Sequence, residues 1–100
     1  MIRSVRSSTP ASDEFAAAVH WYEEQRPGLG GEFFRAVTEG TDRIEGHPEI
    51  GTPLSPDRLT RRVVVPGFPY QIVYRLRPAE IVIVAVAHLS RRPGYWRSRT

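Results

Sequence analysis

In the first half of the chain, apolar residues recur at the spacing of an α-helix. Successive helical residues are rotated by about 100°, so residues three or four positions apart share one face. A first apolar stripe is formed by Phe15, Ala18, Val19 and Tyr22, and a second by Leu29, Phe33, Val37 and Ile44. The sequence Arg-Pro-Gly at 26–28 interrupts the pattern, which predicts two helices joined as an antiparallel hairpin.

The start of the first helix carries typical capping residues. Thr9 is predicted to cap the helix and Pro10 to take its first position. The acidic residues Asp13 and Glu14 favour the positive end of the helix dipole. The first helix is therefore expected to begin at Thr9-Pro10.

The second helix is predicted over residues 29–45. The sequence Gly-His-Pro at 46–48 ends it, because proline cannot continue a helix. The region that follows, residues 47–60, holds three prolines and is predicted to be a loop.

The second half of the chain has the pattern of β-strands. Strands are predicted over residues 61–65, 70–76 and 80–88, and the last of these is almost wholly apolar, so it is expected to be covered on both faces. The tight turn at residues 77–79 makes the last two strands antiparallel. A short strand is also expected over residues 2–7.

These elements define an α+β fold with the order βααβββ. The helix hairpin is expected to pack on one face of a small, mainly antiparallel sheet. A chain of 100 residues has room for one core, so residues 1–100 are predicted to form a single domain.

Composition narrows the class of protein. The chain has no Cys, which excludes a disulfide framework, thiolate metal sites and a cysteine nucleophile. No secretory signal is visible at residues 1–20, and the longest apolar run, residues 81–87, is far too short to span a membrane. We expect a small soluble protein of the cytoplasm, with no membrane partner.

Charge is divided unevenly along the chain. All 14 basic residues apart from the histidines are Arg, and Lys is absent. Residues 1–50 sum to −4, whereas residues 51–100 sum to +7. A basic half of this kind indicates a polyanion, an acidic protein surface or a phosphate-rich site as partner, although a solvated basic rim gives the same pattern.

The strongest candidate site is a set of arginines at the ends of the predicted strands, accompanied by aromatic residues. Its members are Arg61, Arg62, Arg75, Arg91 and Arg92, with Tyr95 and Trp96 beside them. Guanidinium groups with interleaved aromatic rings suit the binding of phosphate and of bases. The sequence leaves open whether these residues form a site or an exposed rim.

Other candidate sites are weaker. His88, at the end of the last strand, is a candidate acid or base, or a residue that fixes the strand end. His20, His47 and His88 lack metal-ligand spacing, so no metal is expected. The glycines at 28–31 follow a helix rather than a strand, so they do not form a dinucleotide loop and no cofactor is expected.

Trp21 lies off the centre of the first helical stripe. It is either a flank of the core or an anchor for a partner protein. The sequence alone does not separate these two roles.

Several segments together resemble the ParE/RelE superfamily of type II toxin–antitoxin toxins, in particular its ParE-like, plasmid-stabilisation branch. The segments are Thr-Pro-Ala at 9–11, Phe-Phe-Arg-Ala-Val at 33–37, His-Pro-Glu-Ile-Gly at 47–51, residues 68–75, and residues 84–88 with Arg91 and Arg92. Their order and spacing cover about residues 2 to 96.

The resemblance implies a toxin that is held inactive by a cognate antitoxin in a hetero-oligomer. ParE-like members inhibit DNA gyrase, whereas RelE-like members are ribosome-dependent endoribonucleases that cut mRNA. In the gyrase-inhibiting interpretation the target-binding residues are the arginine set, His88, Tyr95 and Trp96, while Trp21 binds the antitoxin.

In the ribonuclease interpretation the candidate catalytic residues are Arg62, Arg91, Arg92 and Tyr95. Gln71 and Val64 stand where the cutting enzymes tend to carry basic residues, and neither stabilises a phosphorane by charge. The sequence therefore favours the gyrase-inhibiting branch and keeps the ribonuclease as the alternative.

Overall fold

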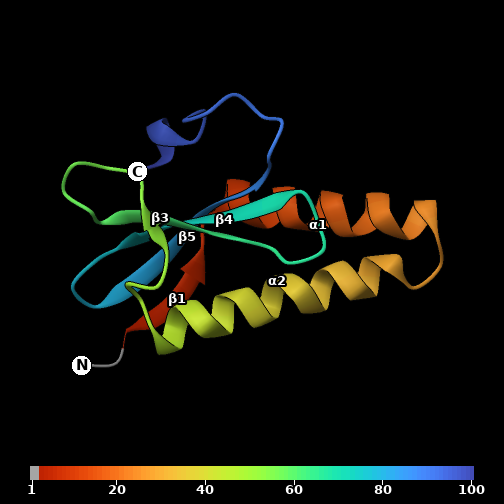
Figure 1. Ribbon diagram of the computed structural model, residues 1–100, viewed down its shortest axis with the longest axis horizontal. Coiled ribbons are helices and arrows are strands. Elements are labelled where there is room, and N and C mark those ends of the chain that lie inside the picture. Colours follow the sequence, from red (N-terminus) through yellow and green to blue (C-terminus); the bar gives the residue numbers. More distant parts are fainter. Residues whose placement is uncertain (1–2) are drawn as a thin grey trace.

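The computed structural model describes residues 3–100 and has two helices and a five-stranded sheet (Figure 1). In chain order the elements are β1 (Ser4–Ser7), α1 (Thr9–Gln25), α2 (Leu29–Gly46), β2 (Thr52–Pro53), β3 (Thr60–Val64), β4 (Tyr70–Leu76), β5 (Glu80–His88) and the 3₁₀ turn η1 (Arg97–Arg99). The predicted α+β class and the position of the helix hairpin are confirmed. No helix of residues 3–100 is long and apolar enough to cross a membrane.

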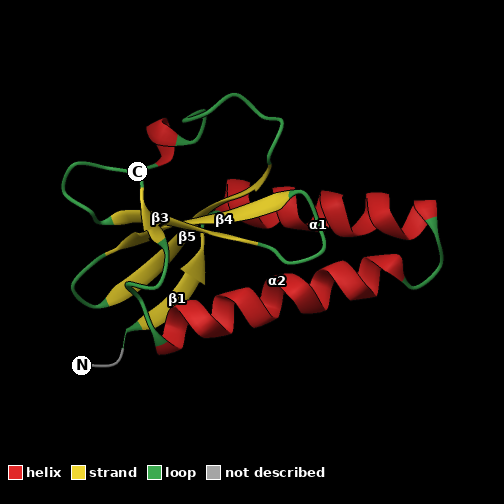
Figure 2. Ribbon diagram, in the orientation of Figure 1, coloured by secondary structure: helices red, strands yellow, loops and turns green. Residues whose placement is uncertain are grey.

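The strands form one sheet in the order β1-β5-β4-β3-β2. β1 runs parallel to β5, and all other neighbours are antiparallel. Figure 2 shows the sheet as a twisted layer with the helices on one side. Strand β5 lies between β1 and β4.

The observed strands differ from the predicted ones at several ends. The two-residue strand β2 lies inside the segment that the sequence predicts as a loop, and it pairs Thr52 with Arg62. A strand this short has no periodicity from which it could be recognised. Of the predicted first strand, residues 4–7 are confirmed, whereas Ile2 lies outside the described residues.

Ser8, rather than Thr9, caps α1. The Ser8 hydroxyl accepts a hydrogen bond from the Ala11 amide at 3.3 Å, and the Ser8 backbone is extended, as a capping residue requires. The helix therefore starts one residue earlier than predicted. Asp13 and Glu14 consequently lie beyond the first turn, which has no acidic residue.

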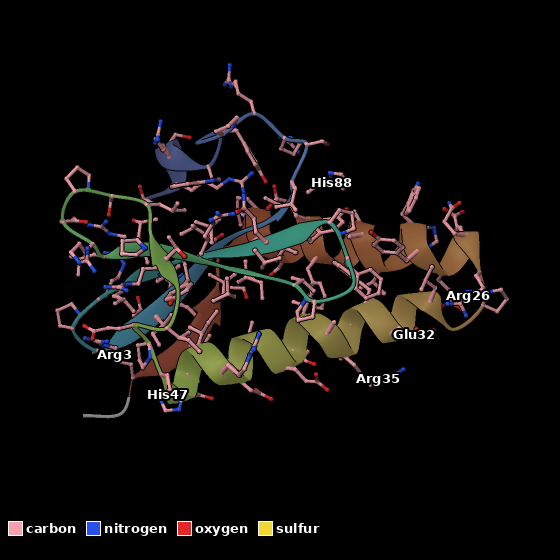
Figure 3. The ribbon with its side chains drawn as sticks, viewed as in Figure 1. Arg3, Arg26, Glu32, Arg35, His47 and His88 are labelled. Atoms are coloured by element: carbon pink, nitrogen blue, oxygen red, sulfur yellow. The ribbon has the colours of Figure 1, made fainter. Side chains whose placement is uncertain are left out.

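Two glycines make the helix hairpin possible. Gly28 caps α2 with φ of 91°, a conformation that disfavours any residue with a Cβ. A Cβ at Gly30 would lie 2.6 Å from the Val19 carbonyl oxygen, so the close approach of α1 and α2 needs a glycine there. Beside this turn, Arg26 donates to Glu32 at 3.2 Å, with both residues at the tip of the hairpin (Figure 3).

The sheet has a core on each face. On the helix side, Phe33, Val37 and Ile44 of α2 pack with Ile72 and Tyr74 of β4, and all five are buried. On the other face the cover is the C-terminal segment, defined here as residues 89–100. α2 and the C-terminal segment lie on opposite sides of the sheet (Figure 1). Both faces of β5 are thus buried, although the sequence does not reveal which segment covers the second face.

A β-bulge shifts the register of β5 against β4. Val73 pairs with Ala85, whereas the next residue, Tyr74, pairs with Ile83, so Val84 is the extra residue. The bulge lies where β1 ends, because Ser7 is the last residue to pair with β5. The chain then leaves the sheet through Ser8, whose amide donates to the Ile83 carbonyl at 2.9 Å. Among residues 3–100, no strand therefore pairs with the second half of β5 on this side.

Candidate binding groove

A groove of about 560 Å³ runs between α1, the strand end of β5 and the C-terminal segment. It is lined by Glu14, Ala17, Ala18, Trp21, Tyr22, Pro69, Tyr70, Val86, His88, Arg91 and Tyr95. Most of these residues are apolar or aromatic. Apart from the tyrosines, the ionisable groups are Glu14 of α1, His88 at the end of β5 and Arg91 of the C-terminal segment. This combination is typical of a site for a peptide or another apolar ligand.

Glu14 accepts more hydrogen bonds than any other side chain of the groove. Its carboxylate accepts two hydrogen bonds from the Arg99 guanidinium, at 2.9 and 3.1 Å, and one from the Tyr95 hydroxyl at 2.6 Å. It also accepts the Val86 amide at 3.1 Å. The sequence gives no sign of this role, because Glu14 and Arg99 are 85 residues apart.

Tyr95 is fixed in the groove wall by this network. Arg91 places its guanidinium carbon 4.0 Å from the centre of the Tyr95 ring, a cation–π contact. Burial and the hydrogen bond to Glu14 raise the pKa of Tyr95 to about 12. At neutral pH the hydroxyl is therefore protonated and acts as a donor.

Arg91 and His88 supply the polar groups at one end of the groove. Arg91 is exposed, and among the described residues no carboxylate pairs with it. His88 accepts the Ser90 amide at its Nδ1 at 3.0 Å and packs edge-on against Tyr70. Figure 3 places His88 beside α1, where the chain leaves β5. The structure thus brings together His88, Arg91 and Tyr95 of the predicted set.

Trp21 lies on the α1 side of the same groove. Its side chain is 54% exposed and contacts Tyr22 edge-to-face. Of the two roles that the sequence leaves open, this exposure favours the anchor for a partner protein over the flank of the core. An exposed tryptophan beside an apolar groove is typical of a residue that anchors a partner.

Arg61, predicted to bind the target, is buried instead. Its guanidinium donates to the carbonyl oxygens of Arg58, Glu49 and Gly51 at 2.9 to 3.0 Å. These bonds connect β3 to the loops on both sides of β2. Arg61 pairs with Tyr74, which lies in the helix-side core, so both side chains are on that face of the sheet. Arg61 is therefore a structural residue.

Trp96 is also buried rather than exposed. It is 6% exposed and packs in the second core with Val73, Val82 and Val84. It therefore fixes the C-terminal segment to the sheet and does not offer a ring to a partner. Arg92, four residues before it, is exposed.

Arg62 and Arg75 lie away from the groove. Arg62 on β3 donates to Gln71 at 3.1 Å, and Arg75 on β4 donates to Asp57 at 2.8 Å. Neighbouring strands are about 4.8 Å apart, so β3 lies about 10 Å from β5. The Tyr95 hydroxyl is directed past the far edge of β5, toward Glu14. The predicted arginine set is therefore divided between the sheet face and the groove.

Comparisons with known proteins agree with this architecture. A family model described as the ParE toxin of type II toxin–antitoxin systems, parDE, matches residues 5–93. No curated protein matches the chain. A solved structure of the chromosomal ParDE toxin–antitoxin system from P. aeruginosa is similar in fold, with a TM-score of 0.74 and 16% sequence identity; the match covers 87% of this chain and 96% of that one.

The matched residues run from β1 to the first part of the C-terminal segment, and they include every residue that lines the groove except Tyr95. The protein is therefore a toxin of the type II toxin–antitoxin class. Within that class, the chain belongs to the ParE toxin family. This confirms the resemblance that the sequence segments indicate.

Proposed function

We propose that the protein inhibits DNA gyrase and that a cognate antitoxin neutralises it. The observation that carries the proposal is the exposed, unpaired Arg91 stacked on Tyr95 in a chain of the ParE toxin family. Binding to a large target needs complementary charge and an aromatic contact, and this wall of the groove offers both.

The target surface consists of His88, Arg91, Arg92 and Tyr95. Arg61 and Trp96 leave this set because both are buried. Arg62 and Arg75 are held by neighbouring side chains on another part of the sheet. The surface is consequently smaller than the sequence predicts and is concentrated in the first half of the C-terminal segment.

Inhibition of supercoiling by purified gyrase tests the proposal. Arg91→Ala should weaken inhibition by about tenfold or more, since an interface arginine contributes about 1–2 kcal/mol. Arg77→Ala is the matched control, because Arg77 is an exposed arginine in the turn between β4 and β5. Gyrase that is unaffected by excess wild-type protein would refute the gyrase target. Deletion of residues 91–100 is a poorer test, because it also removes Trp96 from the second core.

The alternative function, a ribosome-dependent endoribonuclease, has less support. A general base works best when its pKa is near the working pH, whereas the pKa of Tyr95 is raised to about 12. The Tyr95 hydroxyl donates its hydrogen bond to Glu14. Arg62 lies on β3, which is separated by β4 from the strand β5 that borders the groove. This arrangement favours binding over RNA cleavage.

Tyr95→Phe separates the two functions. In a gyrase inhibitor the ring remains and only one of the hydrogen bonds to Glu14 is lost, so we expect a change of a few-fold. In a ribonuclease whose base is Tyr95, cleavage should fall by about 10²-fold or more. Induced expression, followed by parallel readouts of the DNA damage response and of translation arrest, gives the first answer. Codon-specific mRNA cleavage that disappears in Tyr95→Phe would replace the gyrase proposal by the ribonuclease.

The antitoxin is proposed to bind along α1 with Trp21 as its anchor. The groove beside Trp21 is apolar, and Arg91 at its end attracts a carboxylate of the partner. A short antitoxin segment that folds on binding fits such a groove. The complex is therefore a toxin–antitoxin hetero-oligomer in this proposal.

Trp21→Ala should weaken binding of the neighbouring gene product by about tenfold to a hundredfold, typical of a buried interface tryptophan. Phe34→Ala is the control, because Phe34 is a similarly exposed aromatic residue on α2, outside the groove. Calorimetry with the purified partner measures both. Equal losses in the two variants would place the partner across the helix hairpin instead of in the groove.

A further inference from the structure

The open half of β5 is closed by side chains instead of by a strand. β1 ends its pairing with β5 at Ile83, and the next outward backbone groups are the Val84 carbonyl and the Val86 amide. Arg99 donates to the Val84 carbonyl at 3.0 Å, and Glu14 accepts the Val86 amide at 3.1 Å. An ion pair between a helix and the C-terminal segment thus takes the place of a neighbouring strand at this edge.

The same ion pair fixes the groove wall. Arg99 and Glu14 retain only 21% and 18% of their side-chain exposure, so both charges are largely withdrawn from water and depend on each other. Tyr95 binds the same carboxylate, and Arg91 stacks on the Tyr95 ring. The position of Arg91 is therefore linked through Tyr95 to Glu14.

We propose that Glu14 is a positioning residue: it fastens the C-terminal segment to α1 and β5 and thereby sets the place of Arg91 and Tyr95 in the groove wall. Glu14 itself binds neither target nor antitoxin, because its carboxylate oxygens are already occupied by Arg99, Tyr95 and Val86. The effect of Glu14 on toxicity rests on the proposed function, whereas the attachment of the C-terminal segment by Glu14 does not.

Two other features hold the segment and limit what the loss of Glu14 can do. Trp96 packs in the second core, and Arg99 donates to the Val84 carbonyl of β5 at 3.0 Å. The segment in a Glu14 variant should therefore loosen without unfolding the sheet. The signal to look for is local mobility of the C-terminal segment in a protein that remains folded.

Trp96 provides a direct readout of this local change. In a Trp21→Phe background it is the only tryptophan of the chain, so its fluorescence reports the C-terminal segment alone. Glu14→Ala should increase the acrylamide quenching constant of Trp96 several-fold, and Arg99→Ala should have the same effect. The double variant should be no worse than either single variant, because both remove the same pair.

Glu24→Ala is the matched control, since Glu24 is an exposed carboxylate on the same helix, far from the C-terminal segment along α1. Glu14→Gln should give an intermediate result, because the amide oxygen still accepts hydrogen bonds while the charge is lost. Hydrogen exchange of residues 89–100 measures the same change without a fluorophore. Unaltered quenching and exchange in Glu14→Ala would overturn the proposal.

Gyrase inhibition, measured with variants that keep Trp21, tests whether the attachment of the C-terminal segment by Glu14 matters for function. Glu14→Ala should weaken gyrase inhibition about as much as Arg91→Ala does. If Trp96 is freed in Glu14→Ala but the wild-type protein does not inhibit gyrase, the proposed function fails and the positioning role stands. If Trp96 is freed while inhibition is unchanged, the role of Glu14 in placing Arg91 is refuted although the gyrase target survives.

Discussion

The Glu14 carboxylate and the Arg99 guanidinium form an ion pair through two hydrogen bonds, of 2.9 and 3.1 Å, that joins the first helix to the last turn of the chain. The pair also satisfies the backbone of β5 where β1 ends. It therefore serves the sheet, the helix and the groove wall at once. In a protein of the ParE toxin family this makes the C-terminal segment an integral part of the fold.

Breaking this ion pair should reduce stability. Arg99→Ala leaves a largely buried carboxylate without its charged partner, at a cost of about 1–3 kcal/mol in the free energy of unfolding. Arg97→Ala, an exposed neighbour, should change it by less than about 0.5 kcal/mol. Urea unfolding followed by circular dichroism measures both. Similar free energies of unfolding for the two variants would mean that the Glu14–Arg99 ion pair makes no net contribution to stability.

Tyr95 should make stability depend on alkaline pH. Its pKa is about 12 in the folded protein against 10.0 ordinarily, so the folded state holds this proton more tightly. The contribution is fully present below pH 10, is lost as the pH rises from 10 to 12, and amounts to about 1 kcal/mol after allowance for solvent exposure.

The comparison of wild type with Tyr95→Phe isolates this effect, because burial also raises the pKa of Tyr22, Tyr70 and Tyr74. Absorbance at 295 nm over the alkaline range should lose its latest-titrating component in the variant. A variant whose titration at high pH is the same as that of the wild type would assign the most strongly raised pKa to another tyrosine.

Arg61→Ala should destabilise the fold by about 3 kcal/mol, because it removes a buried charged donor from three backbone carbonyl oxygens, of which that of Gly51 is buried. Arg61→Lys should restore little, since one ammonium does not reproduce the geometry of the guanidinium. The control is Arg77→Ala, at an exposed position. If Arg61→Ala has normal thermal stability but no longer inhibits gyrase, Arg61 belongs to the target-binding surface.

Ile83→Asp should unfold the protein or cost more than about 4 kcal/mol, because it places an unpaired charge in the helix-side core. Val64→Asp is the matched control, since Val64 lies on a strand but is 50% exposed. Thermal melts distinguish the two. A cooperative melt for Ile83→Asp near the wild-type temperature would contradict the burial of Ile83 in the helix-side core.

The helices and the three longer antiparallel strands follow from the sequence alone. The apolar spacing of Phe33, Val37 and Ile44 requires a buried helix face, and the alternation in residues 70–76 requires a strand. These patterns are local, so they do not depend on the rest of the chain. β2 is the exception, because two residues show no period.

The composition of the groove was only partly predictable. The sequence singles out His88, Arg91, Tyr95 and Trp21, and the structure brings all four to one groove. The sequence does not indicate that Arg61 is buried, because an arginine in a strand is usually exposed and the partners of Arg61 are backbone carbonyls. Nor does it indicate Glu14, whose local setting is that of an ordinary helical acid.

The sequence by itself determined the kinds of elements, their order and the family resemblance, since these depend on spacing between near neighbours. Only the tertiary structure decided which side chains face the groove and which are enclosed. The pairing of Glu14 with Arg99 depends on the end of β1, the bulge at Val84 and the path of the C-terminal segment over the sheet. Such a contact between distant residues leaves no periodic trace in a single sequence, because it arises from the packing of whole elements.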